Sequence, residues 1–320
     1  MNDRSRHRSP AKGRILIGLI ACAAVALIAL VVIPIVKPPV STGSHPTGRV
    51  PYLGVYEPDA PGSYAGVDRF AQAIGRQPNI ALYYSVWLKP FQVGFAASAA
   101  KRGAVTLVQI DAKNTSLASI ARGRYDSYWR SYAHEVKAFG GRVILSFDHE
   151  MNGTWYTWGY RHESPATFVT AWRHIVTIFR KQGAKNDTWL WTVNFIRDGL
   201  SDVTDPAPWW PGSSYVDWVG IDGYYYNRST LFSSLFGATI ARVRQLTHDP
   251  ILIAETGAAI SANQSAKIGD LFAGVRTFGL LGFVLFDQDG VHETQSWRIS
   301  SPATYAALRQ DAKAYMKPPS

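Results

Sequence analysis

The sequence contains one cysteine, Cys22, and it lies in an apolar segment close to the N-terminus. The rest of the chain therefore has no disulfide bond and no thiolate metal site. A domain formed by residues 50–320 can be stable without disulfides, because its core is large enough. The spacing of a helical zinc site is also absent, since His149-Glu150 has no second histidine at the required distance. We therefore expect no metal and no other cofactor.

Positive charge is not concentrated on the part of the chain that can fold. The formal net charge is +10. Residues 1–49 hold seven Lys or Arg and one acidic residue, so they account for six of these charges and leave four on residues 50–320. A nucleic-acid-binding protein concentrates basic residues on one face or helix. The even distribution after residue 50 predicts that nucleic acid is not a partner.

Residues 15–36 are 22 consecutive residues without a formal charge. At 1.5 Å per residue, this run is long enough to span a bilayer core of about 30 Å. The basic tail over residues 1–14 is expected to stay in the cytoplasm, which places the following domain outside the cell. We predict a single-pass signal-anchor in the cell membrane, followed by a linker rich in Pro, Gly and Ser over residues 37–49.

Two alternatives to an uncleaved anchor remain. A cleaved signal peptide would have a shorter apolar stretch, of about 7–15 residues. The stretch Leu19-Ile20-Ala21-Cys22 resembles a bacterial lipoprotein processing box, although the chain stays apolar for fourteen residues after Cys22.

From residue 50 to residue 318, short β-branched or aromatic runs alternate with stretches of helical period, which is typical of a parallel α/β fold. The predicted strands are Tyr52–Tyr56, Ile80–Ser85, Val105–Ile110, Arg142–Phe147, Thr188–Asn194, Val216–Asp222, Ile251–Ala254 and Leu281–Phe286. Predicted helices between them include Ile120–Phe139, Pro165–Gln182, Phe232–Leu246 and Ala262–Phe278. Eight strands in a domain of this size predict a (β/α)8 TIM barrel. The alternative is an open doubly wound sheet, but no glycine-rich phosphate turn follows the first strand.

In such a barrel the active site lies at the carboxyl ends of the strands. The polar residues predicted there are Glu57, Asp111, His149, Glu150, Asn194, Asp222, Tyr224, Glu255 and Asp287. Glu150 and Glu255 each close a strongly apolar run. Two such acids suit glycoside hydrolysis, in which one protonates the leaving oxygen and the other attacks the anomeric carbon or activates water. The alternative for either acid is a helix cap or an ion pair with Arg.

The eleven residues from His149 to Gly159, HEMNGTWYTWG, closely resemble the acid/base signature of glycoside hydrolase family 26. That family includes β-mannanases and some mixed-linkage β-glucanases. Further similar segments follow in the same order over residues 171–194, 216–227, 251–257, 286–290 and 296–299. The resemblance covers roughly residues 50–315.

This resemblance implies that Glu150 is the general acid/base and Glu255 the nucleophile of a retaining endo-acting enzyme. It also implies that His149 and Trp155 contact the sugar near the cleavage point. Tyr224 would donate a hydrogen bond to the nucleophile, with Asp222 beside it helping to order the site. The implied substrate is β-1,4-linked polysaccharide of the mannan type, and we expect a monomer.

The chain departs from the family pattern at two strand ends. The eighth strand of the family commonly ends in Trp-Phe, whose Trp stacks under the sugar, whereas the corresponding pair here is Leu285-Phe286. We keep Phe286 as a predicted sugar contact and expect another ring, or a different sugar, at this subsite. The third strand ends in Asp111, where an aromatic residue or His is expected. Further candidates for sugar platforms are Trp87, Trp209-Trp210 and Tyr224-Tyr225-Tyr226, and the alternative for each of the three Trp is packing beneath a loop.

These departures leave three alternatives to a mannanase. The first is a β-1,3-1,4-glucanase, and the second is a hydrolase that trims an exopolysaccharide made by the same cell. The third is of another class, a non-catalytic carbohydrate-binding barrel. The presence of both Glu150 and Glu255 argues against the third, because a binding protein has no need of two catalytic acids.

Overall fold

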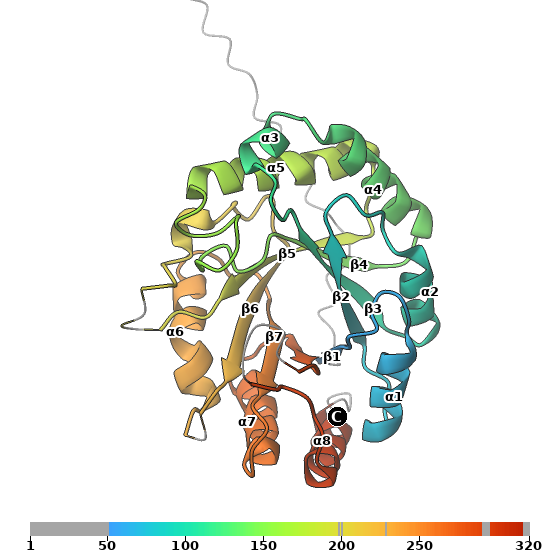
Figure 1. The fold of residues 1–320 in the computed structure, drawn as a ribbon, viewed down its shortest axis with the longest axis vertical. Helices are drawn as coiled ribbons and strands as arrows, with labels where there is room; N and C mark the ends of the chain where they lie inside the picture. Colours follow the sequence, from blue (N-terminus) through green and yellow to red (C-terminus); the bar gives the residue numbers. More distant parts are fainter. Residues whose placement is uncertain (1–50, 198, 200, 228, 290–294, 316–320) are drawn as a thin grey trace, which may run out of the picture. The chain divides into compact units, whose positions relative to one another are not determined.

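The computed structural model describes residues 51–315 except residues 198, 200, 228 and 290–294 (Figure 1). These residues belong to the second of the two units into which the chain divides, which spans residues 39–320. The predicted tail, signal-anchor and linker lie outside the described residues. Among the helices that are described, none combines the length and the apolar character needed to cross a membrane.

Eight parallel strands close into a barrel in the order of the sequence, so the predicted (β/α)8 fold is confirmed (Figure 1). The strands are β1 Tyr52–Tyr56, β2 Ile80–Val86, β3 Val105–Asp111, β4 Val143–Phe147, β5 Asp187–Asn194, β6 Trp218–Tyr225, β7 Ile251–Ala258 and β8 Gly282–Phe286. Every predicted strand is present, with small shifts at its ends. The observed strands β6 and β7 run furthest beyond the predicted ends. Strand β7 continues past Glu255 instead of ending there.

Helices surround the barrel and cover the outer face of its wall (Figure 1). They are α1 Ala65–Ile74, α2 Val93–Lys101, α3 Leu117–Ala121, α4 Asp126–Phe139, α5 Pro165–Gln182, α6 Phe232–Arg244, α7 Gln264–Thr277 and α8 Pro302–Tyr315. Helix α5 has the predicted bounds. It begins after Ser164, whose hydroxyl accepts a hydrogen bond from the Thr167 backbone N–H, and it ends at Gly183 in the left-handed conformation.

The single helix predicted over Ile120–Phe139 is wrong. It is divided into α3 and α4, and the turn between them contains Gly123 with φ of 84°. Glycine reaches this conformation without steric cost, so it ends α3 and allows the chain to change direction. Between β5 and β6 the described residues form only a short 3₁₀ helix, η1 Ala207–Trp209, in place of an α-helix.

The core has two layers, one on each side of the barrel wall. The inner layer contains at least one residue from every strand: Tyr52, Ile80, Leu82, Leu107, Ile144, Leu190, Trp218, Leu252, Ala254 and Val284. The outer layer packs between the strands and the helices. Because successive side chains of a strand point to opposite faces, these inner residues determine which later residues of each strand also face inward.

Two glycines in the middle of helices provide a test of this packing. A Cβ added at Gly274 in α7 would lie 2.0 Å from the Phe232 ring, whereas a Cβ at Gly237 in α6 would meet nothing within 4 Å. We expect Gly274→Ala to lower the free energy of unfolding by about 1–3 kcal/mol, because the ring must move. Gly237→Ala should raise it by about 0.5–1 kcal/mol, because alanine favours the helix. Equilibrium urea unfolding measures both changes, and equal effects of the two substitutions would contradict the packing of α7 on α6.

Candidate active site

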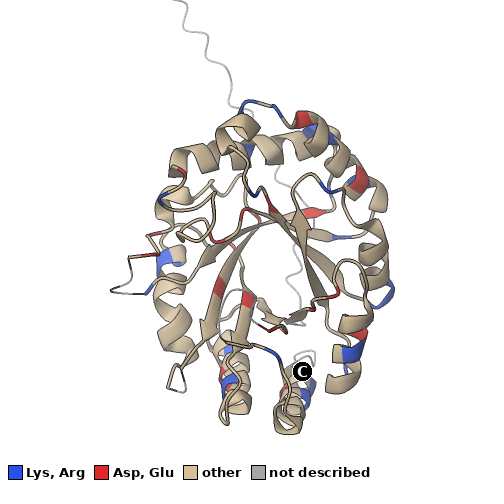
Figure 2. Cartoon of the chain, viewed as in Figure 1, with Lys and Arg blue, Asp and Glu red and all other residues tan. Residues whose placement is uncertain are grey.

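Polar side chains replace the apolar ones toward the carboxyl ends of the strands. On β2, Tyr84 follows the inner residue Leu82, and on β6, Asp222 and Tyr224 follow the inner residue Trp218 on the same face. On β8, the aromatic residue Phe286 follows the inner residue Val284. Figure 2 shows acidic residues on strands and loops around the barrel centre, with most Lys and Arg on the surrounding helices and loops. The barrel centre is therefore a buried and predominantly acidic site.

Glu255 reaches this centre through an irregularity in β7. Leu252 and Ala254 face inward, so regular alternation would turn Glu255 outward. However, Ile221 of β6 pairs with Ile253, and the next residue, Asp222, pairs with Glu255. One extra residue in β7 is a β-bulge, which changes the direction of the side chains that follow. The bulge places Glu255 beside Asp222 on the inner face.

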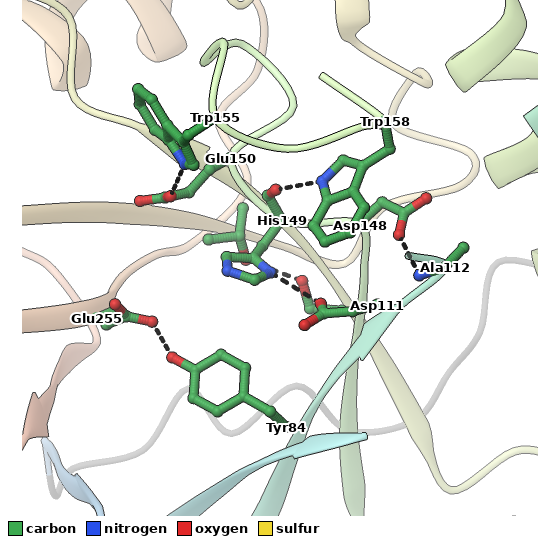
Figure 3. Close-up of polar contacts among 11 residues, drawn as sticks. Tyr84, Asp111, Ala112, Asp148, His149, Glu150, Trp155, Trp158 and Glu255 are labelled. Atoms are coloured by element: carbon green, nitrogen blue, oxygen red, sulfur yellow. Dashed lines mark hydrogen bonds and ion pairs between the residues drawn. The ribbon is translucent and has the colours of Figure 1, made fainter. Parts of the chain in front are cut away.

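Two tyrosines fix the carboxylate of Glu255. The Tyr84 hydroxyl donates a hydrogen bond to Oε2, as Figure 3 shows, and the Tyr224 hydroxyl donates one to Oε1. Burial, reinforced by the charge of Glu255, raises the pKa of both tyrosines well above its usual value. Both hydroxyls therefore stay protonated and act as donors. The hydrogen bond that was predicted for Tyr224 is present, and the equivalent one from Tyr84 was missed.

Glu150 lies on a tight segment that follows β4. Asp148 and Glu150 have positive φ angles of 48° and 54°, which are uncommon for residues with side chains. The segment is held in place because the Asp148 backbone N–H donates to Ile110 and the Glu150 backbone N–H donates to Thr192. Asp148 also accepts a hydrogen bond of 2.7 Å from the Ala112 backbone N–H (Figure 3).

The two oxygens of the Glu150 carboxyl group have different partners. Asn194 Nδ2 donates to Oε1 at 2.5 Å. Trp155 Nε1 donates to Oε2 at 2.7 Å, as Figure 3 shows. Burial is the largest cause that raises the pKa of Glu150 to about 7, and the charge of Glu255 adds to it, while His149 and the two donors oppose it. A carboxyl group with this pKa can hold a proton near neutral pH and release it, as a general acid/base must.

His149 lies beside both glutamates. Its Nδ1 is 3.1 Å from Asp111 Oδ1, and Figure 3 shows Asp111 beside this edge of the ring. Burial lowers the pKa of His149, but the charges of Asp111, Glu150 and Glu255 together raise it to about 9. The imidazole is therefore a cation at neutral pH and compensates part of the negative charge around it. Asp111, which departs from the family pattern, has this role as the partner of His149.

The structure corrects the expectation that Leu285, at the end of β8, takes the place of a Trp that stacks under the sugar. Leu285 is buried in the outer layer between the barrel and the helices, so it does not face the site. The residue of β8 that faces the site is Phe286, whose ring stacks on Tyr56 at 4.9 Å and lies 6.1 Å from the Tyr224 ring. Strand alternation turns Phe286, and not Leu285, toward the sugar site, so Leu285 does not take the place of the stacking Trp.

The other aromatic residues that were candidates for stacking on a sugar differ in their burial. Trp209 is buried and packs against Phe168, so its prediction as a sugar platform is wrong. Trp87 is half-buried among the rings of Tyr125, Tyr128 and Trp129. By contrast, the ring of Trp155 is 44% exposed beside Glu150, which leaves a face free to stack on a sugar.

The structure brings all seven predicted site residues together. They are His149, Glu150, Trp155, Asp222, Tyr224, Glu255 and Phe286. Residues missed as neighbours of the site include Tyr84 and also Trp297, whose ring lies 4.4 Å from Tyr224. Tyr84 could have been found from the alternation of Ile80, Leu82 and Tyr84 in β2. Trp297 lies in the segment 296–299 that resembles the family, but its contact with Tyr224 does not follow from the sequence.

Comparisons with known proteins agree with this geometry. A family model described as glycosyl hydrolase family 26 matches residues 128–260. Endoglucanase H of Acetivibrio thermocellus is 30% identical over 264 residues, which are 78% of this chain and 29% of that protein. A mannan endo-1,4-beta-mannosidase of Bifidobacterium adolescentis is 27% identical over 175 residues, which are 54% of this chain and 16% of that protein. The chain belongs to glycosyl hydrolase family 26.

The predicted family is therefore confirmed, and the domain is a glycoside hydrolase of that family. The chain spans less than a third of the length of the curated relatives it matches. Among solved structures, a GH26 beta-mannanase from Bacteroides ovatus has a TM-score of 0.62 at 15% identity and covers 84% of this chain and 90% of its own. The Bacillus subtilis mannanase BCman has a TM-score of 0.60 at 21% identity, over 83% of this chain and 86% of its own. At these identities the similarity shows the barrel fold alone.

A second carboxyl pair in this family 26 barrel lies outside the site. Glu57 and Asp287 follow the adjacent strands β1 and β8 and hydrogen-bond to each other. They are one residue beyond the inward-facing Tyr56 and Phe286, so alternation turns them away from the site. Burial is the largest cause that raises the pKa of Glu57 from 4.5 to about 8, and Asp287 adds to it. The sequence placed both residues among the candidates for chemistry, but their position is structural.

This pair predicts a dependence of stability on pH. The pKa of Glu57 is higher in the folded protein than in the unfolded chain, so its contribution is fully present below about pH 4.5 and is lost as pH rises through about 8. Glu57→Gln keeps a donor toward Asp287 and removes the titration. Between pH 5 and pH 9, the free energy of unfolding of the wild type should fall by about 2 kcal/mol more than that of the variant. Urea unfolding measured across this range tests the expectation, and two parallel pH profiles would contradict it.

Proposed function

We propose that the domain is a retaining endo-β-glycosidase that hydrolyses β-1,4-linked polysaccharide, with Glu150 as acid/base and Glu255 as nucleophile. The observation that carries the proposal is the different environment of the two glutamates. Glu150 has its pKa raised to about 7, whereas both oxygens of Glu255 accept hydrogen bonds from tyrosine hydroxyls. Pairs of carboxyl groups separated in this way are the usual division between acid and nucleophile in glycosidases.

In the first step, an oxygen of Glu255 attacks the anomeric carbon while the bond from this carbon to the glycosidic oxygen breaks. Glu150 gives its proton to the departing oxygen, so the leaving chain departs as a neutral alcohol. In the second step, Glu150 accepts a proton from water, and the water oxygen attacks the anomeric carbon and releases Glu255. Two inversions at the same carbon give net retention.

The neighbouring residues have separate tasks in this scheme. Tyr84 and Tyr224 hold the nucleophile in one rotation, so that an oxygen faces the sugar. Asn194 and Trp155 hold the acid/base at both oxygens. His149 carries a positive charge beside Glu150, which stabilises the carboxylate that remains after the proton has left.

The mannan type is the leading substrate class because three curated relatives are named as mannan endo-1,4-beta-mannosidases. A second candidate is a β-glucan, and the specific observation in its favour is the match to Endoglucanase H. That match covers 78% of this chain, against 54% or less for the mannosidases. Phe286, in place of a larger Trp at the site-facing position of β8, is compatible with either sugar.

Substitution of the two glutamates tests the chemistry. We expect Glu150→Ala and Glu255→Ala each to lower kcat by at least about 10²–10⁴-fold on the best of mannan, lichenan and xylan, measured as release of reducing sugar. Sodium azide should restore turnover of an activated aryl glycoside, giving the β-azide with Glu150→Ala and the α-azide with Glu255→Ala. Glu163→Ala, on the loop after β4, is the matched control and should retain activity.

Two results would overturn the assignment. If the first product of the wild type, followed by NMR, has the inverted anomeric configuration, Glu255 is not a nucleophile. If the wild type releases no more sugar than the double variant on any polymer, yet binds one of them, the domain is a carbohydrate-binding barrel.

We also propose that residues 15–36 anchor the domain to the outer side of the cell membrane. The support is the uncharged run of 22 residues behind a basic tail. Full-length protein should remain in the membrane fraction after a high-salt wash, and external protease should reach the domain in intact cells. Replacing Ile20 and Leu27 by Arg should abolish membrane retention, whereas a wild-type protein found in the medium without residues 1–36 would show that the segment is cleaved.

A further inference from the structure

Three potential metal ligands converge at the base of the site. His149, Asp222 and Glu255 come from three different parts of the barrel, and one nitrogen or oxygen atom of each lies within 4.8 Å of the others. All three side chains are buried, with exposed fractions of 2%, 0% and 8%. Each belongs to a different segment of the barrel wall, so their convergence is fixed by the fold and not by local flexibility.

Asp222 is the member of this group whose buried carboxyl group is not held by hydrogen bonds within the described part of the chain. Neither of its carboxylate oxygens has a hydrogen-bond partner among the described residues, although the side chain is fully buried. A buried carboxyl group without a partner is costly, and such groups in folded proteins usually have a partner that is a water, an ion or a ligand. Because Asp222 is paired in register with Glu255 across the bulge, its side chain is directed into the same space as Glu255.

His149 is oriented as a metal-binding histidine would be. Its Nδ1 faces Asp111 Oδ1 at 3.1 Å, which leaves Nε2 as the nitrogen available to a ligand (Figure 3). A carboxylate that holds one ring nitrogen fixes the tautomer and the orientation of a metal-ligating imidazole, and it increases the basicity of the other nitrogen. The pair of Asp111 and His149 therefore has the form of a metal ligand with its supporting residue.

We propose that His149 Nε2, one oxygen of Asp222 and one oxygen of Glu255 bind a single divalent transition-metal ion, for which Zn²⁺ is the probe. One imidazole and two carboxylates, with a fourth position open to water, form a ligand set that zinc accepts. Mg²⁺ and Ca²⁺ prefer shells of six or more oxygen ligands, so the imidazole selects against them.

The charges around the three ligands favour a dication. The carboxyl groups of Asp111, Glu150 and Glu255 act electrostatically on His149, and those of Glu150 and Glu255 act on Asp222. Metal ligands bind in their deprotonated forms, so zinc binding is coupled to proton release.

The ion would bind to the carboxylate of Glu255, which we propose as nucleophile, so bound zinc would inhibit the enzyme. This consequence depends on the proposed function, but the binding itself does not. Substrate and zinc would compete for the same space, and zinc should therefore raise KM while kcat at saturating substrate stays unchanged.

Direct binding tests the site without substrate. Full-length protein in detergent is treated with a chelator, dialysed and titrated with ZnCl₂ by isothermal calorimetry. We expect one ion per chain in the wild type, binding at least tenfold weaker in Asp222→Asn and in His149→Gln, and binding 10–100-fold weaker in Asp111→Asn. Glu57→Gln removes a buried carboxyl group outside the cluster and should leave zinc affinity unchanged, and MgCl₂ should give no binding.

A measurement on the unaltered protein guards against variants that fail to fold. Addition of Co²⁺ to the wild type should produce the visible absorption of a low-coordinate site, and Zn²⁺ should abolish it with the same stoichiometry. The proposal is overturned if the wild type binds no zinc, or if Asp222→Asn and His149→Gln, shown to be folded by circular dichroism, bind zinc as tightly as the wild type. If the wild type binds zinc at this cluster but hydrolyses no polysaccharide, the proposed function fails and the metal site stands.

Discussion

The extra residue in β7 is the constraint on which the site depends. Without it, the alternation that turns Leu252 and Ala254 inward would turn Glu255 toward the surrounding helices. The hydroxyls of Tyr84 and Tyr224 would then lose the carboxylate that accepts their hydrogen bonds. The pairing of β7 with β6 and the pairing of β7 with β8 both shift after Ile253, so both show the same irregularity. Bulges occur next to active sites because they redirect one side chain while the sheet continues, and here β7 continues to Ala258.

A second irregularity, in the backbone that follows β4, places Glu150 on the opposite wall of the site. Asp148 and Glu150 adopt left-handed backbone conformations, each of which costs of order 1 kcal/mol or more and needs support from the surroundings. The support comes from backbone hydrogen bonds to β3 and β5 and from the amide of Asn194. The two glutamates are thus brought together by a bulge in one strand and a tight turn after another. The regular barrel supplies the frame for both irregularities but does not itself aim either carboxyl group.

The sequence predicts the regular part of this structure well, because apolar runs and helical periods are repeated along the chain. All eight strands follow from them, and the motif from His149 to Gly159 identifies Glu150. The sequence does not show which face of the sheet a side chain points to once an irregularity interrupts the alternation along a strand. Glu255 was placed at a strand end, whereas the bulge inside the strand is what turns it inward, and Leu285 was given the position that alternation assigns to Phe286. Tyr84 was missed because it lies inside β2, and only polar residues at the ends of the strands were candidates.

The distribution of protons in the site follows from the same geometry. Burial alone would keep most of these acids neutral, yet their neighbours differ: two tyrosine hydroxyls at Glu255, an amide and an indole at Glu150, and no hydrogen-bond partner for Asp222 among the described residues. Burial, followed by the charges of Glu255 and Glu150, raises the pKa of Asp222 well above its usual value, while Glu255 accepts hydrogen bonds from both tyrosines. His149, held by Asp111, adds the balancing positive charge. A site arranged in this way can hold and release a proton at Glu150 while the two tyrosine hydroxyls keep Glu255 in position.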